Sequence, residues 1–247
     1  MKLKKTVGNR TGPGGLLLVD KPEGWTSHDV VAYVKGRYRP GKVGHAGTLD
    51  PLATGLLILG LGSATKSLGK VAACDKEYLV GLLLGRRTST GDMEGEVVEE
   101  SGVCVSGEEL AGAVLSIEGE IEQVPPIYSA VKYKGKPLYS YARKGMDVPR
   151  KARRVNVVEV EVLEMEVPNV LFRAVVSKGT YIRTLCEDIG KKVGCPSMMS
   201  YLRRTRIGEY YIKDAVTIDD LKRMDREMLE KILIQINDET RNPNDPF

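Results

Sequence analysis

The chain has 247 residues, of which 42% are hydrophobic and 28% are charged, and its formal net charge is +4. These values belong to an ordinary globular protein that can bury a full core, so they exclude general disorder. No segment reaches the ~20 apolar residues that a membrane-spanning helix needs. The N-terminal stretch lacks the apolar segment of a secretory signal. We therefore expect a cytoplasmic protein without membrane association.

The N-terminal part of the sequence predicts a leader, a strand and a helix. Residues 1–14 are basic and rich in glycine, with no regular period, so we expect a loose leader there. The apolar run 16–19 predicts a buried strand. A helix is expected over 26–38, with Thr26 or Ser27 as its N-cap and valines along one face.

The segment 39–55 is rich in glycine, threonine and proline. It follows neither the helical nor the strand period, so we expect a loop there. Regular elements resume after it. Strands are expected at 56–61, 77–84 and 96–100, and a helix at 64–73.

The C-terminal half mixes helices and strands. Ser106-Gly107-Glu108-Glu109 has the form of a capping box and predicts a helix that ends near Ile117. Strands are expected at 155–163, 170–176 and 198–207, the first two as a pair, and helices at 181–193 and 217–236. Because there is no strict β-α-β alternation, the fold class is expected to be α+β, with a mixed, mainly antiparallel central sheet flanked by helices.

Positive charge is concentrated in one stretch that interrupts the regular pattern. Residues 132–154 contain nine basic residues and one acidic residue, a local charge of +8, so the remainder sums to −4. This asymmetry predicts a basic surface for a polyanion, with tyrosines that can stack on bases. For any single residue, a solvated charged loop is the alternative. The basic residues are Lys132, Lys134, Lys136, Arg143, Lys144, Arg150, Lys151, Arg153 and Arg154, and the tyrosines are Tyr128, Tyr133, Tyr139 and Tyr141.

The cysteine pattern argues against a metal site. Cys74, Cys104, Cys186 and Cys195 form no Cys-X-X-Cys pair, and the chain has only two histidines. These residues cannot make a zinc site at standard spacing, so we expect free thiols, no metal and no cofactor.

Asp50, in the loop Gly47-Thr48-Leu49-Asp50-Pro51-Leu52-Ala53-Thr54-Gly55, is the sharpest candidate for chemistry. Pro51 keeps the backbone of Asp50 extended. The glycines allow tight turns and a close approach of substrate, and the threonine hydroxyls can fix the loop by hydrogen bonds. Taken alone, however, an Asp-Pro pair in a glycine-rich loop is usually a turn.

The longer stretch Lys42 to Gly55 resembles the catalytic loop of bacterial tRNA pseudouridine-55 synthases, the TruB type. Further motifs follow in that family's order across residues 15–210. They are Val19-Asp20-Lys21-Pro22 with Thr26-Ser27, Asp75-Lys76-Glu77-Tyr78, Val124-Pro125-Pro126-Ile127-Tyr128-Ser129-Ala130, Lys178-Gly179-Thr180-Tyr181-Ile182-Arg183 and Tyr201-Leu202-Arg203-Arg204. The resemblance implies a pseudouridine synthase fold over residues 15–213, with an RNA-binding insertion at 125–154.

The same resemblance implies that the protein isomerises a uridine in the T-loop of tRNA without a cofactor. The reaction breaks the bond from C1′ to N1 and rejoins the base through C5, so it needs a carboxylate that can add to the nucleoside. A base stacked inside a loop must also be flipped out. Asp50 matches this carboxylate. Whether it attacks C1′ or C6, or deprotonates C2′, stays open at the level of sequence.

Three further residues match positions near the substrate. Arg183 matches an arginine that pairs with the catalytic carboxylate, and its alternative is a helix-surface pair with Glu187. Tyr78 matches the tyrosine that stacks on the target base, and Leu202 matches an apolar wall of the pocket. For both of these residues, ordinary core packing is the alternative.

His45 matches a histidine that enters the space left by the flipped bases, with hydrogen bonding inside the loop as the alternative. Lys21 and Pro22 resemble a motif that supports the catalytic loop, so we expect a structural role for both. His28, near the start of a helix, is also expected to be structural.

The resemblance implies the T-arm of tRNA as the partner, and we expect a monomer without an obligate protein partner. Most bacterial members carry a small RNA-binding domain after the catalytic one, but only 37 residues follow Tyr210 here. We expect residues 214–247, with nine acidic and five basic residues, to form an acidic helical tail and not that full domain. Either the protein lacks the domain or the chain stops short of it.

Two other functions stay open at this stage. The basic insertion would also suit an RNA-binding helper that opens and refolds the elbow of tRNA. A sister enzyme that acts with a guide RNA is a further alternative. The Leu52-Ala53 pair after Pro51 and the expected absence of a full C-terminal domain argue against the guide-RNA enzyme.

Overall fold

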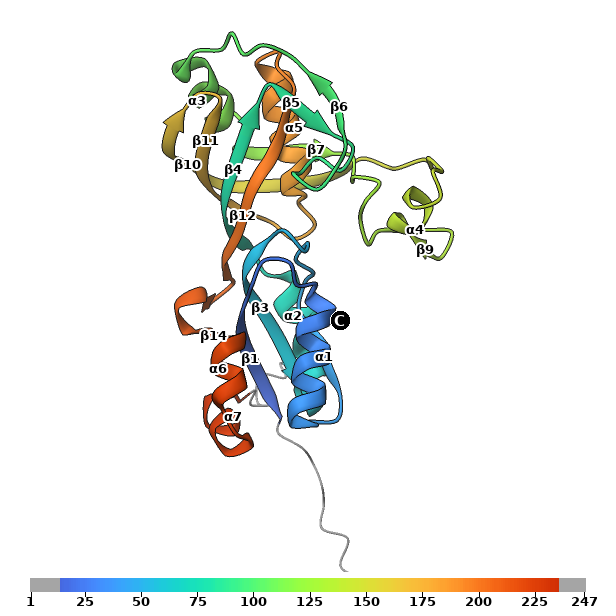
Figure 1. The fold of residues 1–247 in the computed structure, drawn as a ribbon, viewed down its shortest axis with the longest axis vertical. Helices are drawn as coiled ribbons and strands as arrows, with labels where there is room; N and C mark the ends of the chain where they lie inside the picture. The colour runs from blue at the N-terminus through green and yellow to red at the C-terminus, as the bar shows by residue number, and fades with distance from the viewer. Residues whose placement is uncertain (1–13, 236–247) are drawn as a thin grey trace, which may run out of the picture. The chain divides into compact units, whose positions relative to one another are not determined.

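A computed structural model describes residues 14–235 of the chain (Figure 1). Nearly all of the expected leader and the end of the expected tail, 236–247, lie outside the described residues. The described residues form two compact units. The first comprises residues 14–51, 55–72 and 210–235, and the second comprises 52–54 and 73–209.

The first unit is built on a small mixed sheet. β1 (Gly15–Lys21) pairs antiparallel with β3 (Thr54–Leu61) and parallel with β14 (Val216–Thr217). β2 (Val43–His45) pairs antiparallel with β3. β2 falls in the segment that we expected to be a loop. The sequence did not predict this strand, because three residues are too few to show a strand period.

Helices of the first unit pack against this sheet. α1 (Ser27–Tyr38) begins at Thr26, whose hydroxyl and the Asp29 carboxylate form a capping box. A 3₁₀ helix (Gly62–Ser67) leads into α2 (Leu68–Ala73), where we expected one continuous helix. One apolar core joins Val30 and Val34 of α1 to Leu57 and Leu59 of β3 and to Leu221 in the C-terminal segment.

The C-terminal segment completes the first unit. It contains β13 (Tyr210–Tyr211), a 3₁₀ turn (Ile212–Asp214), α6 (Ile218–Arg223) and α7 (Arg226–Ile232). The expectation of one helix over 217–236 was wrong, because the backbone is extended at Met224 and the Asp225 side chain caps a new helix. The Arg37 guanidinium donates to the carbonyls of Leu221, Lys222 and Met224 at the end of α6.

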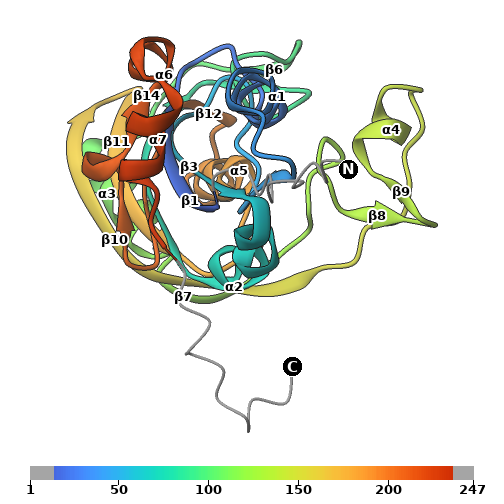
Figure 2. The same ribbon diagram turned by 90° about the horizontal axis from the view of Figure 1, so that it is seen from below.

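The second unit contains an antiparallel sheet of order β12-β4-β11-β10-β7. Figure 2 shows α5 (Ile182–Lys192) inside the curve of this sheet. The expected pairing of 155–163 with 170–176 is confirmed by the register Val160↔Ala174. The strands are β4 (Lys76–Leu84), β7 (Gly119–Gln123), β10 (Arg153–Glu166), β11 (Asn169–Val176) and β12 (Ser197–Ile207).

Two smaller hairpins and two helices complete the second unit. β5 (Arg86–Thr88) pairs with β6 (Val97–Glu100), and α3 (Gly107–Leu115) begins at the expected capping box of Ser106. Inside the basic insertion, β8 (Lys132–Tyr133) pairs with β9 (Lys136–Pro137), and α4 (Tyr139–Ala142) follows. The expected α+β class with a mainly antiparallel sheet is confirmed.

Within residues 14–235, no helix is both long and apolar enough to cross a membrane.

Candidate active site

The loop that carries Asp50 is anchored on both sides of that residue. On one side, the Leu49 N–H donates to the Ser27 hydroxyl at 2.8 Å, and this hydroxyl donates back to the Leu49 carbonyl at 3.1 Å. On the other side, the Pro51 carbonyl accepts from the Gly24 N–H at 3.0 Å. The backbone of Asp50 is thus fixed from both neighbours, as a carboxylate with a set direction requires.

Lys21 supplies a second anchor for the same loop. Its side chain is fully buried. Its ammonium donates to the carbonyls of Pro22 at 2.8 Å, Trp25 at 2.6 Å and Pro51 at 3.1 Å. A buried ammonium is tolerated when its three protons are hydrogen-bonded, and here they bind the turn after β1 to the Asp50 loop.

His45 also belongs to the first unit. It ends β2, opposite Leu59 of β3, and is half-buried. Gly47 follows with φ +92°, a conformation that only glycine adopts without strain, so the chain turns sharply between His45 and Asp50. Lys21, Pro22, His45 and Asp50 therefore all lie in the first unit.

Tyr78 and Leu202 lie on adjacent strands of the second unit. In the register of β4 and β12, Leu202 is opposite Val80 and Arg204 is opposite Tyr78. Opposite residues of an antiparallel pair project to the same face, and so do residues two apart on one strand. Tyr78 and Leu202 thus share one face of the sheet, and both are at least nine-tenths buried.

Arg183 lies in the first turn of α5 and is 7% exposed. Its guanidinium donates to the Thr90 carbonyl at 2.9 Å and to the Tyr128 carbonyl at 2.8 Å. It also lies 3.6 Å from the Asp92 carboxylate. The Arg183 side chain is therefore held in one orientation by the loop after β5 and by the start of the insertion.

Sequence analysis missed Asp92 and Ser27 as supports of the site. Asp92 is buried, and one of its carboxylate oxygens accepts from the Thr90 hydroxyl at 2.5 Å and the Glu94 N–H at 3.1 Å. The available signal was an aspartate in a turn next to glycine and threonine, which is common in ordinary loops. Ser27 looked like a helix cap, but Thr26 takes that role and leaves the Ser27 hydroxyl to Leu49.

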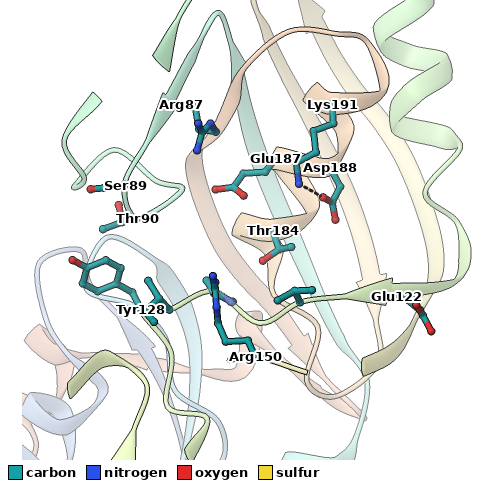
Figure 3. A pocket seen from close by; sticks show the side chains of 13 residues that line it. Arg87, Ser89, Thr90, Glu122, Tyr128, Arg150, Thr184, Glu187, Asp188 and Lys191 are labelled. Carbon is teal, nitrogen blue, oxygen red and sulfur yellow. Dashed lines mark hydrogen bonds and ion pairs between the residues drawn. The ribbon is translucent and has the colours of Figure 1, made fainter. Parts of the chain in front are cut away.

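A polar hollow of about 470 Å³ lies beside α5 in the second unit (Figure 3). The two ends of the insertion contribute Tyr128 and Arg150 to its lining, and α5 contributes Thr184, Glu187 and Lys191. Burial raises the pKa of the Glu187 carboxyl. The Lys191 ammonium bonds the Asp188 carboxylate at 2.7 Å. Three basic and three acidic residues line this hollow, so its charges balance.

A second hollow of about 360 Å³ lies within the insertion and has a different character. Tyr133, Val131 and Leu138 give it an apolar part. Its charged lining residues are all basic, namely Lys132, Lys134, Arg150, Lys151 and Arg153. Phosphate groups are the natural ligands of such a lining.

Comparison with known proteins identifies the family. Residues 35–182 match the model described as TruB family pseudouridylate synthase, N-terminal domain. The chain belongs to the TruB family. Residues 183–237 match the model of the tRNA pseudouridylate synthase B C-terminal domain. The TruB models thus meet inside the region that we expected to be one catalytic domain, and the expected division at residues 213 and 214 stays a prediction.

Curated tRNA pseudouridine synthases B resemble this chain over most of its length. The tRNA pseudouridine synthase B of Syntrophotalea carbinolica is 43% identical over 92% of this chain and 74% of its own length. The same enzyme of Enterobacter sp. (strain 638) is 47% identical over 88% of this chain and 68% of its own length. A solved Cbf5-Nop10-Gar1 complex contains a chain that is 32% identical, with a TM-score of 0.70 over 93% of this chain and 62% of that one.

Proposed function

We propose that this protein is an isomerase that converts the uridine at position 55, in the T-loop of tRNA, to pseudouridine. The observation that carries the proposal is the placement of Asp50, fixed through Leu49 and Pro51, in a chain of the TruB family. The base is flipped out of the loop, and Asp50 supplies the carboxylate that adds to the nucleoside. The isomerisation is redox-neutral and uses no cofactor.

The other site residues take the roles that the resemblance implies. Arg183 binds at the reacting nucleotide and keeps the catalytic carboxylate ionised, because a neighbouring guanidinium favours the charged form. Tyr78 stacks on the target base and Leu202 forms an apolar wall beside it. Both roles are supported by their common face on β4 and β12. His45 fills the space that the flipped bases leave, while Lys21 and Pro22 support the loop.

Residues 125–154 bind the RNA stem in this proposal. The hollow with only basic charged residues supports a phosphate-binding role. The insertion also carries aromatic surface. The rings of Tyr133 and Tyr141 pack edge to face with their centroids 5.8 Å apart, and the Lys134 ammonium lies over the Tyr133 ring. Phosphate contacts supply affinity, whereas the folded shape of the T-arm and its extruded bases supply recognition. We further propose that the protein acts as a monomer in the cytoplasm.

The function is tested with T-arm RNA that carries tritium at C5 of its uridines. Pseudouridine formation replaces the C5–H bond by the bond to C1′, so tritium appears in water. We expect one equivalent to be released per RNA by the purified protein, and none when the target uridine is replaced by cytidine. Absence of release would refute the proposal, and release only after a small co-purifying RNA is added would favour the guide-RNA alternative.

The basic insertion is expected to control affinity more than catalysis. Replacing the exposed Lys132, Lys134 and Lys136 by alanine should weaken RNA binding and reduce the slope of log affinity against log salt by about 2. Binding titrations at several salt concentrations measure both effects. As a matched control, the exposed Lys213, Lys222 and Lys231 are changed to alanine, and the slope should then stay within about 0.5 of its original value. Equal effects of the two triples would contradict an RNA-binding role for the insertion.

A further inference from the structure

Two contacts fasten residues 123–128, which lead from β7 into the insertion, to the first turn of α5. The first contact is made by the Gln123 side chain to the backbone of Tyr181. The second is made by the Tyr128 carbonyl to the Arg183 guanidinium. Both contacts lie inside the second unit. They connect the same short segment to Tyr181 and to Arg183, two residues apart in the chain.

Gln123 is 1% exposed and ends β7. Its carboxamide oxygen accepts from the Tyr181 N–H at 3.0 Å, and its amide nitrogen donates to the Tyr181 carbonyl at 3.3 Å. One side chain thus satisfies both main-chain groups of a single residue, which fixes the position and the rotation of that residue.

Tyr181 is the N-cap residue of α5, and its own side chain makes no capping hydrogen bond. Its carbonyl accepts the first helical bond, from the Leu185 N–H at 3.0 Å. The start of α5 is therefore set by Gln123, a residue 58 positions earlier in the chain. Arg183 follows Tyr181 by two residues, so the same contact sets the backbone position from which the Arg183 side chain extends.

We propose that Gln123 is a positioning residue for the isomerisation, and that it acts by holding Tyr181 so that Arg183 meets the Tyr128 and Thr90 carbonyls. This inference rests on the proposed function and deepens it. Arg183 has a defined orientation only while α5 starts at the right place. Small displacements of a catalytic group are costly, since about 1 Å reduces the rate on the order of 100-fold. Gln123 itself does not touch the reacting atoms in this proposal.

Gln123→Met removes both hydrogen bonds at similar volume, and Gln123→Glu keeps the acceptor for the Tyr181 N–H but lacks the donor. Single-turnover rates at saturating T-arm RNA, KM values and thermal midpoints are measured for each. We expect Gln123→Met to reduce the rate roughly 10- to 100-fold with KM changed less than about threefold. Gln123→Glu should recover part of the rate, and it decides the question by the same criterion if the methionine variant does not fold.

Ser197→Ala is the matched control. Ser197, the first residue of β12, is also buried. Its hydroxyl donates to the Cys186 carbonyl of α5 at 2.7 Å, away from the first turn of that helix. Its loss should lower the thermal midpoint but leave the rate within about threefold of the unchanged protein. If Gln123→Met is no slower than Ser197→Ala, or if its effect lies entirely in KM, the positioning role is refuted.

A double-mutant cycle with Arg183→Lys tests whether Gln123 acts through Arg183. In that background Gln123→Met should slow the reaction by less than about threefold further, because groups that act as a unit are not additive. Full multiplication of the two effects would overturn the inference. An inactive unchanged protein would instead refute the proposed function, so the two failures are distinguishable.

Discussion

Asp50→Asn is expected to abolish tritium release from T-arm RNA, with a reduction of at least roughly 10³-fold in the single-turnover rate. Asparagine has nearly the same shape as aspartate but carries no charge and is a far weaker nucleophile. Contacts from Ser27, Gly24 and Lys21 hold the neighbours of Asp50 and do not involve its carboxylate, so they survive the substitution. The change therefore removes the chemical group and leaves the loop in place.

RNA affinity should change little in the same variant. Most of the binding free energy comes from phosphate contacts, and we place these in the insertion and not in the Asp50 loop. Filter binding is expected to give a dissociation constant within about threefold of the unchanged protein. Asp214→Asn, at an exposed aspartate of the first unit, serves as the control and should keep full activity. Undiminished tritium release by Asp50→Asn would refute the role of Asp50.

Asp50→Asn also separates the enzyme from the RNA-binding helper. A helper opens and refolds the tRNA elbow by binding alone, so it does not need the carboxylate. If the variant restored full growth to cells that lack the gene, the main contribution of the protein would be binding. If the protein is an enzyme, tRNA from cells that carry only the Asp50→Asn variant should lack pseudouridine at the target position, whatever the effect on growth.

The long periodic elements could be predicted from the sequence, because the local spacing of their apolar residues indicates which face is buried. Helix α5 was expected at 181–193 and lies at 182–192, and β4 was expected at 77–84 and lies at 76–84. β7 was not predicted, because its glutamates give a polar segment with no apolar run. It becomes a strand only by pairing with β10, which is distant in the sequence, and local residues do not encode such a pairing.

The candidate site likewise contains residues that a local motif identifies and residues that only distant contacts identify. Asp50 could be singled out because a long motif surrounds it, and Lys21 because it belongs to a second motif. Asp92 and Gln123 carried no comparable signal. They became candidates only through contacts with Arg183 and Tyr181, which lie 91 and 58 residues further along the chain. Such contacts arise only when the chain has folded, so only the structure could identify them.

Lys21→Met is expected to lower both stability and catalysis. The buried ammonium is replaced by an apolar side chain, and the partly buried carbonyls of Pro22 and Trp25 lose this donor. A buried acceptor without a partner costs about 1–3 kcal/mol, and partly buried acceptors fall in the lower part of that range, so we expect a loss of about 2–4 kcal/mol in the free energy of unfolding. The thermal midpoint should fall by roughly 5–15 °C, as measured by calorimetry.

Catalysis should suffer separately, because the Lys21 ammonium also bonds the carbonyl of Pro51, the residue after Asp50. We expect the rate of the folded fraction to fall about 10- to 100-fold, as for a misplaced catalytic group. Arg37→Met is the matched control, since the Arg37 guanidinium likewise donates to three backbone carbonyls of the first unit. Because Arg37 is exposed, water can replace its hydrogen bonds, so the variant should cost less stability than Lys21→Met and leave the rate per folded molecule unchanged. If Lys21→Met also leaves the rate per folded molecule unchanged, Lys21 stabilises the fold without placing Asp50.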